Sequence, residues 1–454
     1  MSHWVALGFT ALLVVATVAT NKGRRTIMLL ARFLLHVTLI SAEDRIWRRV
    51  LNLPGPLPRN LGEVIDDPQR FEKLLRQNKA LAADEDVLSI LPLAAITTEP
   101  DKKATAGSIR VLIGKDGKQT RELKLFCKFQ TGRGMPIWLQ AIRAAAEPGV
   151  CREVDFYSQV SDSVPIKTLK PYLTLKYPSL NYVLVALEYV DLENGQARVV
   201  NDYKGATVSE VKKMVTEVAK MHAKFVDASE PEVSWIPARR GLEYAKFVES
   251  FTDKTEKVWS HKVWGALNKY FSERPVTLVH GDCRPGNMMF EGSDRDNVAG
   301  IIFADWEATN IAPLMWDLTY CTTLGWTARS RRKNFNDILD AYLESLATEA
   351  SSAQAVVPTS EEARLDVALL TLVLGYVSRT VRVKKFWANQ GNTQKDTVSW
   401  FVRMALAISD LDAASVSQAL GVDKEDVVRI QEDGLREVRE EKAITTKEED
   451  WIDL

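Results

Sequence analysis

Hydrophobic residues form one long uncharged run near the start of the sequence. Residues 4–20 contain no charged side chain, and Lys22, Arg24 and Arg25 follow directly. The run reaches the short end of the roughly 17 to 25 residues that cross a bilayer as a helix. A cleaved signal peptide and a buried core helix are the alternatives, but no Lys or Arg precedes the run and it lacks a polar face. Residues 1–25 are therefore predicted to be a single-pass membrane anchor, and the positive cluster places the rest of the chain in the cytosol.

A second apolar stretch, residues 26–40, is interrupted by Arg32 and His36. It is too short and too polar for a second span, so it is predicted to be an amphipathic helix that lies on the membrane or packs on the globular body. The pattern then becomes polar and is broken by prolines. We expect residues 26–93 to form a membrane-proximal helix and a linker with short helices.

The middle of the chain has strand-like segments bounded by turn residues. Residues 108–113 and 122–129 predict two strands, and the Gly-Lys-Asp-Gly sequence between them predicts a hairpin turn. A helical stretch follows around residues 137–160, and a further strand is predicted at 182–189. Residues 94–190 are therefore expected to form a small β-rich lobe.

Helical patterns dominate after residue 209, with short strands predicted between residues 276 and 304. Residues 191–420 are expected to form a larger, mainly helical lobe. The acidic tail, residues 421–454, predicts an exposed helix and a loose end. The predicted fold class is α+β, with two lobes and an N-terminal membrane helix, and ligands tend to bind between such lobes.

Composition and charge narrow the class of protein. Apolar residues make up 46% and charged residues 26%, which excludes a disordered or fibrous chain. Lys and Arg number 59 against 60 Asp and Glu, so no net charge attracts the chain to nucleic acid. The cysteines are scattered without a C-x-x-C pair, which argues against a zinc site or disulfide framework and fits a reducing compartment.

One segment carries residues with a chemical pattern. A short strand from Val276 runs into the loop HGDCRPGN, and a later strand ends on Asp305. An acid, an amide five residues later and a second acid are typical of phosphoryl transfer, because Mg²⁺ must neutralise the charge of the transferred group. Asn287 and Asp305 can supply the oxygen ligands that Mg²⁺ prefers. Asp282 is left to orient and deprotonate an attacking hydroxyl.

The motif H-G-D-x-x-x-x-N followed by D-W-E resembles the aminoglycoside phosphotransferase and choline kinase family. These are small-molecule kinases with the protein-kinase fold, and the similarity is closest to their CHK kinase-like branch, which includes the ecdysteroid 22-kinases. Further motifs occur in the family's order: LFCKFQ, CREVDFY, LVALEYVDL, VAKMHAKF and MWDLTY. The resemblance spans residues 100 to 420 approximately, and it implies a two-lobed kinase-like fold with ATP and Mg²⁺ as cofactors.

The resemblance also implies roles for individual residues. Lys128 in LFCKFQ corresponds to the strand lysine that binds phosphate, and Glu153 in CREVDFY to the helix glutamate that pairs with it. The segment LVALEYVDL resembles the hinge that holds adenine through backbone groups, assigned here to Glu188 and Val190. Asp317 in MWDLTY corresponds to the aspartate that braces the catalytic loop.

Two segments depart from better-known kinase patterns. Trp306 and Glu307 follow the metal aspartate, where protein kinases have Phe-Gly; this agrees with small-molecule kinases. The nucleotide loop, residues 103–108, has a single glycine and no G-x-G-x-x-G. The residues of this loop that touch phosphate therefore stay unassigned.

Each candidate has a structural alternative. Strand lysines and helix glutamates are often solvated, and Asp and Asn often cap turns; the ordered set of motifs favours function. His280 is interpreted as holding the loop, Cys283 as incidental, and Arg284 as facing either substrate or solvent. The basic runs at 329–333 and 379–385 are interpreted as solvated faces or as surfaces toward an anionic membrane leaflet.

These observations predict an ATP- and Mg²⁺-dependent kinase that transfers a phosphoryl group to a hydroxyl of a small alcohol, with lipophilic alcohols among the candidates. A membrane-anchored pseudokinase that acts as a binding or scaffold protein is the first alternative. A protein kinase is the second, and the missing D-F-G and A-P-E motifs count against it. The expected partners are the acceptor and the membrane, without nucleic acid; the sequence identifies neither the acceptor nor the oligomeric state.

Overall fold

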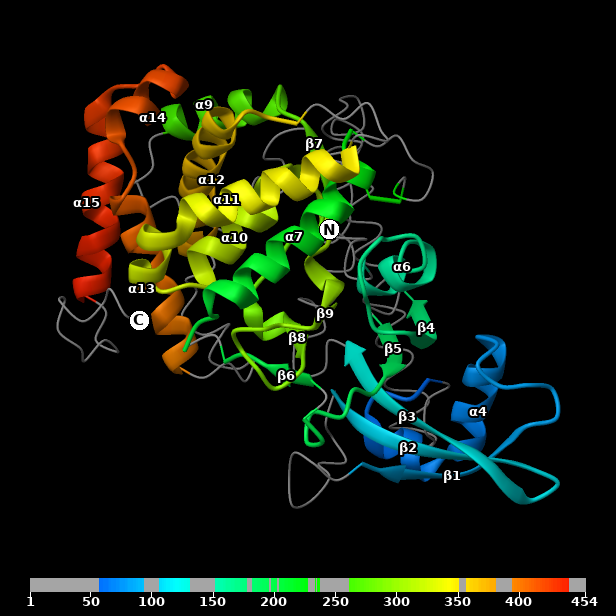
Figure 1. Ribbon diagram of the computed structural model, residues 1–454. Coiled ribbons are helices and arrows are strands. Elements are labelled where there is room, and N and C mark those ends of the chain that lie inside the picture. The colour runs from blue at the N-terminus through cyan, green and yellow to red at the C-terminus, as the bar shows by residue number, and fades with distance from the viewer. Residues whose placement is uncertain are drawn as a thin grey trace, which may run out of the picture. The chain divides into compact units, whose positions relative to one another are not determined.

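The chain divides into two units in the computed structural model (Figure 1). The first unit comprises Met1–Ser158 and Lys170–Tyr189, and the second comprises Gln159–Leu169 and Val190–Leu454. The structure describes residues 57–93, 106–130, 152–177, 182–195, 197–201, 204–227, 233, 235–236, 261–350, 357–380 and 394–440. The predicted anchor at 4–20 and the apolar stretch at 26–40 lie outside these residues, as do residues 103–105 of the nucleotide loop.

An antiparallel sheet of five strands, in the order β1-β2-β3-β5-β4, forms the first unit. The predicted hairpin is confirmed as β2 and β3: Asp116 and Gly117 at its tip have φ of 52° and 71°, as a tight two-residue turn requires. The predicted strand at 182–189 is confirmed as β5, which pairs with β3 and β4 and whose residues 182–187 are all buried. The strands are β1 (Asp86–Pro92), β2 (Ala106–Lys115), β3 (Lys118–Gln130), β4 (Pro171–Tyr177) and β5 (Tyr182–Glu188).

Two short helices, α3 (Leu61–Asp66) and α4 (Pro68–Gln77), pack with β1 in the core of the first unit. Their N-caps, Asn60 and Asp67, accept backbone N–H groups of the first turn, which starts each helix. Phe71 and Leu75 of α4 are fully buried in the same core as the sheet. The short helices predicted within residues 26–93 are therefore present here, but they belong to the core of the folded unit and not to a linker.

Short antiparallel strands of the second unit carry the predicted chemistry. One pair is β7 (Val276–Val279) with β10 (Asn310–Pro313), and β8 (Met288–Glu291) lies between β6 (Ala197–Val199) and β9 (Gly300–Phe303). Two single-turn 3₁₀ helices, η5 (Pro285–Asn287) and η6 (Trp306–Ala308), follow β7 and β9. The strands predicted between 276 and 304 are confirmed, whereas β6 and β10 were not predicted.

Helices make up most of the second unit, as predicted. The first long one begins at a capping box, in which Thr207 and Glu210 each accept the other's backbone N–H. No helix among the described residues is long and apolar enough to span a bilayer. The helices are α6 (Arg152–Gln159), almost wholly in the first unit, and α7 (Val208–Phe225), α9 (His261–Ser272), α10 (Trp316–Leu324), α11 (Ala328–Ala350), α12 (Ser360–Thr380), α13 (Gln394–Ser409), α14 (Ala413–Leu420) and α15 (Lys424–Glu440).

The acidic tail does not begin as the exposed helix predicted for it. Val427 and Ile430 of α15 are buried, and Val438 is buried together with Val402 and Ala405 of α13. The acidic residues outnumber these apolar positions in sequence, but the apolar positions recur on one helical face. Helix α15 is therefore part of the second unit.

The first basic run is a solvated face except at one position: Arg329, Arg332 and Lys333 are exposed, whereas Arg331 is not. Arg331 is buried, and its guanidinium and that of Arg332 each lie 2.7 Å from a carboxylate oxygen of Asp410. Burial lowers the pKa of Arg331, and the hydrogen bond that Arg331 donates to Asp410 opposes this shift. Both arginines thus pair with Asp410 within the second unit, and Arg331 is the one that departs from the predicted exposure.

Candidate active site

The loop between β7 and β8, residues 280–287, is held by Asp317 at the start of α10. The fully buried carboxylate of Asp317 accepts the backbone N–H of His280 at 2.7 Å and that of Gly281 at 2.9 Å. Gly281 has a φ of +85°, and a Cβ there would lie 2.1 Å from the carbonyl oxygen of Ala308, so only glycine fits. The bracing that the resemblance implies for Asp317 is confirmed.

A buried histidine on α7 supports this aspartate in turn. Nε2 of His222 donates to Asp317 at 3.1 Å, and Nδ1 lies 2.7 Å from the hydroxyl of Tyr342 on α11. Burial raises the pKa of Tyr342 well above its ordinary value, so the hydroxyl keeps its proton. Both partners come from helices distant in sequence, and VAKMHAKF, the motif that contains His222, was the only signal for this contact.

His280 is occupied by structural hydrogen bonds. Its Nε2 donates to the carbonyl of Ala304 at 2.9 Å, and its Nδ1 accepts the backbone N–H of Asp282 at 3.3 Å. The imidazole ring also packs on Trp306, with centroids 4.5 Å apart. This arrangement agrees with the interpretation that His280 holds the loop and does not react.

The two carboxylate oxygens of Asp282 have different surroundings. Oδ2 accepts a hydrogen bond from Nδ2 of Asn287 at 2.7 Å and another from Nε of Arg284 at 3.2 Å. Oδ1 accepts none from the part of the chain that the structure describes, and the side chain is 23% exposed. Oδ1 is therefore the oxygen that can take a proton from an incoming hydroxyl.

Asn287 and Asp305 lie at the same end of the paired strands β8 and β9. The backbone carbonyl of Asn287 accepts the N–H of Ala304 at 3.1 Å, directly before Asp305. Nδ2 of Asn287 donates to the backbone carbonyl and the carboxylate of Asp282, which leaves its Oδ1 as an oxygen donor. Asp305 itself has a φ of 63°, a left-handed conformation that costs a non-glycine residue some strain and that recurs at active sites as well as in turns.

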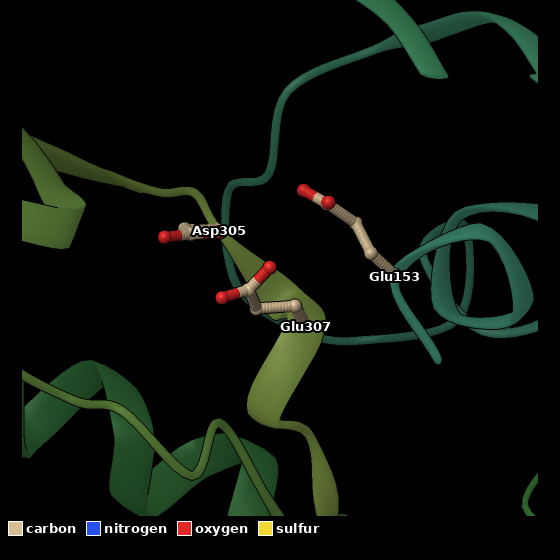
Figure 2. Close-up of side chains that lie close together, drawn as sticks. All are labelled: Glu153, Asp305 and Glu307. Carbon is tan, nitrogen blue, oxygen red and sulfur yellow. The ribbon is translucent and has the colours of Figure 1, made fainter. Parts of the chain in front are cut away.

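Glu307, a further oxygen donor in this turn, was not among the metal ligands predicted from the sequence. Its carboxylate has an oxygen within 4.8 Å of one of Asp305, because the η6 turn separates the two residues by a single position. Figure 2 shows both side chains and also draws Glu153 of the first unit. Carboxylate and amide oxygens are the ligands that Mg²⁺ binds, so Asn287, Asp305 and Glu307 fit a divalent cation.

The ion pair predicted for the first unit is present. Nζ of Lys128 on β3 lies 3.0 Å from Oε2 of Glu153 on α6, with side chains that are 27% and 7% exposed. Partial burial means that salt screens this pair less than a surface pair. The structure thus brings together the two residues that the resemblance implies, and the lysine is held in one orientation.

Glu188 and Val190, the predicted hinge residues, lie at the end of β5. Glu188 is fixed by Lys170: its backbone N–H donates to the Lys170 carbonyl at 2.8 Å, and its carboxylate accepts the Lys170 N–H at 2.9 Å. Val190 is half-buried, and its backbone N–H makes no hydrogen bond to any described residue. That N–H can therefore donate to a ligand.

Cys283, the cysteine in the loop, is buried and is expected to be unreactive. Cys283 is buried, and burial raises the pKa of its thiol well above the ordinary value. Cys127 and Cys321 are likewise buried and free, and burial raises the pKa of Cys127 to about 12. A neutral, buried thiol is a poor nucleophile, which agrees with the interpretation of Cys283 as incidental.

Residues 126–353, half of the 454-residue chain, match the APH family, described as the phosphotransferase enzyme family. The chain therefore belongs to the phosphotransferase enzyme family. The matched segment contains the ion pair of the first unit and the loop and turn residues of the second. It does not distinguish the CHK kinase-like branch from other members.

Comparison with curated proteins gave no match. Similar solved structures include a microcompartment-associated aminopropanol kinase, 11% identical, covering 82% of this chain and 99% of that one at a TM-score of 0.34. Amicoumacin kinase hAmiN, in complex with AMP-PNP, Ca²⁺ and Ami, is 11% identical. The match covers 78% of this chain and 97% of that one, with a TM-score of 0.36. Macrolide 2′-phosphotransferase MphH from Brachybacterium faecium is 11% identical. The match covers 78% of this chain and 97% of that one, with a TM-score of 0.37. Similarity at this level does not assign a substrate to this chain.

Proposed function

We propose that the protein is an ATP- and Mg²⁺-dependent kinase that phosphorylates a hydroxyl group of a small molecule. The observation that carries the proposal is the unequal environment of the Asp282 oxygens, since Oδ2 is held by two donors and Oδ1 is left to accept a proton. Membership of a phosphotransferase family supports the reaction type. The Trp306-Glu307 sequence after the metal aspartate supports a small-molecule acceptor over a protein.

In the proposed reaction, Oδ1 of Asp282 takes the proton of the acceptor hydroxyl while the acceptor oxygen attacks the γ-phosphorus of ATP. A new P–O bond forms, the bond between the γ-phosphorus and the bridging oxygen breaks, and the electron pair leaves with ADP. Asp282 afterwards releases the proton to solvent, which its partial exposure permits. Asn287 and Arg284 keep the carboxylate in place throughout.

Asn287, Asp305 and Glu307 are the residues that would hold the magnesium ion. Bound Mg²⁺ neutralises the negative charge of the phosphate oxygens. Asn287 has a second task, because its amide nitrogen holds Asp282 while its oxygen remains for the metal. This shared residue ties the position of the base to the metal-binding turn.

The nucleotide is assigned to the Lys128–Glu153 pair and to the backbone of Glu188 and Val190. Lys128 would bind the phosphates, and Glu153 holds its ammonium group in place at 3.0 Å. The N–H of Val190, without a partner among the described residues, would donate to adenine. Because a backbone N–H would bind the adenine, the side chain at position 190 can vary without loss of this hydrogen bond.

Lys128→Met and Glu153→Gln should each lower kcat/KM for ATP by about 100-fold, because a misplaced phosphate contact has a cost of this order. The double variant should fall no further than the worse single variant, since the two residues act as one unit. Steady-state kinetics on the three variants would measure this. Losses that multiply would contradict the pairing.

Lys124→Met provides a matched control for this cycle. Lys124 lies on the same strand, and its ammonium group faces Glu122 at 4.0 Å with both side chains well exposed. A surface pair of this kind contributes little to stability. The control variant should therefore keep wild-type kinetics, and a comparable loss in it would indicate a general effect of changing β3.

The test of the function is a screen of hydroxylated small molecules with the full chain, ATP and Mg²⁺. Mass spectrometry should detect an acceptor that gains one phosphoryl group, with equimolar ADP, and Asp282→Asn provides the blank. Binding of ATP without transfer to any acceptor would favour the pseudokinase alternative.

We also propose that residues 4–20 anchor the enzyme in a membrane with its kinase part in the cytosol, and that it is a CHK-like kinase able to act on lipophilic alcohols. The uncharged run and the following Lys22, Arg24 and Arg25 support this orientation. A cytosolic location supplies ATP and Mg²⁺. An anchored enzyme also stays close to acceptors that partition into lipid.

In microsomes, a C-terminal tag on the full chain should be digested by added protease, while the anchored chain resists carbonate extraction. Leu13→Arg with Val15→Arg should make the chain extractable, because each arginine at a helix centre costs about 3 kcal/mol on insertion. A protected tag, or a mature N-terminus near Asn21, would instead place the enzyme in the secretory lumen.

A further inference from the structure

Arg284 links the proposed base to a distant helix. Its Nε donates to Oδ2 of Asp282 at 3.2 Å, and its guanidinium carbon lies 5.0 Å from the ring centre of Trp400 on α13. The Arg284 side chain is only 17% exposed. A cation over an indole face at this distance is attracted to the ring, more strongly when water is largely excluded. The ring therefore helps to hold the guanidinium beside Asp282.

The hydrogen bond from Arg284 helps to determine which carboxylate oxygen of Asp282 is already bonded and which is available to the acceptor. The two oxygens of a carboxylate are equivalent until hydrogen-bond donors distinguish them. Asn287 and Arg284 both donate to Oδ2. If the carboxylate rotated and its oxygens exchanged places, the two donors would bond whichever oxygen now stood at that position. Together they keep one oxygen occupied and the other, Oδ1, available.

Trp400 lies outside the segment that matches the phosphotransferase family, residues 126–353. It reaches the loop because α10 packs against α13 within the second unit. The neighbouring Pro285 is also closely packed, since a Cβ at Gly325 would lie 2.8 Å from its Cδ. The side of the loop that carries Arg284 therefore rests on residues that come after it in the sequence.

We infer that Arg284, seated on Trp400, is a positioning residue that holds Oδ2 of Asp282 and thereby presents Oδ1 to the acceptor hydroxyl. The inference rests on the proposed function and deepens it, because it assigns to α13 a share in orienting the base. Arg284 acts through Asp282, and its loss should slow the chemical step more than it weakens nucleotide binding.

The experiment uses the full chain with four single substitutions. Arg284→Met and Trp400→Leu should each lower kcat by about 10- to 100-fold, since a small displacement of a reacting group can cost 100-fold. KM for ATP should stay within about twofold of wild type, as expected when an interaction acts only in the chemical step. Arg284→Lys and Trp400→Phe, which keep the charge and a ring, should retain more activity.

The double variant Arg284→Met with Trp400→Leu tests whether the two residues act together. Its kcat should be no lower than that of Arg284→Met alone, because Trp400 acts only by holding the guanidinium. Losses that multiply would overturn the proposed link between Trp400 and the base.

Arg274→Met is the matched control for a purely structural role. The guanidinium of Arg274 lies 5.7 Å from the ring centre of Tyr270 and 2.8 Å from Asp366, so it too sits between a ring and a carboxylate. Loss of this pair should lower Tm while kcat stays at the wild-type value. A fall in kcat that only follows the fall in Tm across all variants would overturn the positioning role.

Acceptor phosphorylation and slow ATP hydrolysis by water are measured in parallel, with Asp282→Asn as the reference. If the wild type turns over, Asp282→Asn does not, and Arg284→Met keeps the wild-type kcat, the inference is wrong while the proposed function stands. If the wild type is no more active than Asp282→Asn in either assay, the proposed function fails and the inference falls with it.

Discussion

Replacing Asp282 with asparagine should lower kcat by about 10²- to 10⁴-fold and leave ATP affinity close to wild type, because the variant removes a general base without removing a hydrogen-bond acceptor. The amide oxygen can take the position of Oδ2 and accept from Asn287 and Arg284. The amide NH₂ then stands where Oδ1 was, and it cannot take a proton. Steady-state kinetics and calorimetry with ATP would measure both quantities.

Two further variants sharpen this experiment. Asp282→Ala removes both oxygens and leaves the donors of Asn287 and Arg284 without this acceptor, so it should lose stability as well as activity. Asp340→Asn, at an exposed aspartate of α11, should change neither. An Asp282→Asn enzyme that retains the wild-type kcat would show that Asp282 is not the base, and the assignment of the whole loop would need revision.

The parts of the site that sequence predicts well are those with short, ordered spacing. Asp282 and Asn287 lie five residues apart in one loop, and a strand pair then brings Asp305 beside them. The pairing of Lys128 with Glu153 spans two elements, but each element has its own motif, so the resemblance could identify both residues. Local geometry and motif order were sufficient for these predictions.

The residues that sequence reasoning missed are brought in by packing or by one turn's geometry. Trp400 reaches Arg284 across more than a hundred residues, and no spacing rule relates them. His222 lies in a motif, but its contact with Asp317 depends on how α7 packs. Glu307 belongs to the D-W-E motif. Its carboxylate lies near that of Asp305 because Asp305 has a left-handed backbone and a 3₁₀ turn follows it.

Burial explains the predictions of exposure that differ from the structure. Helix α15 is rich in charge, yet its few apolar side chains share one face and pack on α13. Arg331 belongs to a basic run, but Asp410, far along the chain, accepts its hydrogen bond in a buried position. Charge content describes a segment's average, whereas burial depends on which positions face a neighbour. Residues 26–93 were predicted to include a linker with short helices; the short helices α3 and α4 are present, but they pack in the core of the first unit.

The second large effect is expected on Mg²⁺-dependent ATP binding when Asp305 in the proposed metal site is replaced. Asp305→Ala and Asp305→Gly should both weaken Mg²⁺-dependent ATP binding by more than about 100-fold, which exceeds the usual cost of losing an outer-shell partner of a metal ligand. Each variant removes a charged oxygen donor, whereas Asn287→Ala removes a neutral one and should weaken binding less. Calorimetry with ATP, in the presence and absence of Mg²⁺, would separate the metal-dependent part from nucleotide binding itself.

The alanine and glycine variants should differ in stability, which separates the metal role of Asp305 from its backbone role. At a φ of 63°, alanine carries a Cβ penalty of roughly 1 to 2 kcal/mol, and glycine does not. Asp305→Gly should therefore unfold at a higher Tm than Asp305→Ala while binding Mg²⁺ and ATP equally poorly. If affinity instead followed Tm across the two variants, the loss would come from distortion of the turn, and the carboxylate of Asp305 would not be a metal ligand.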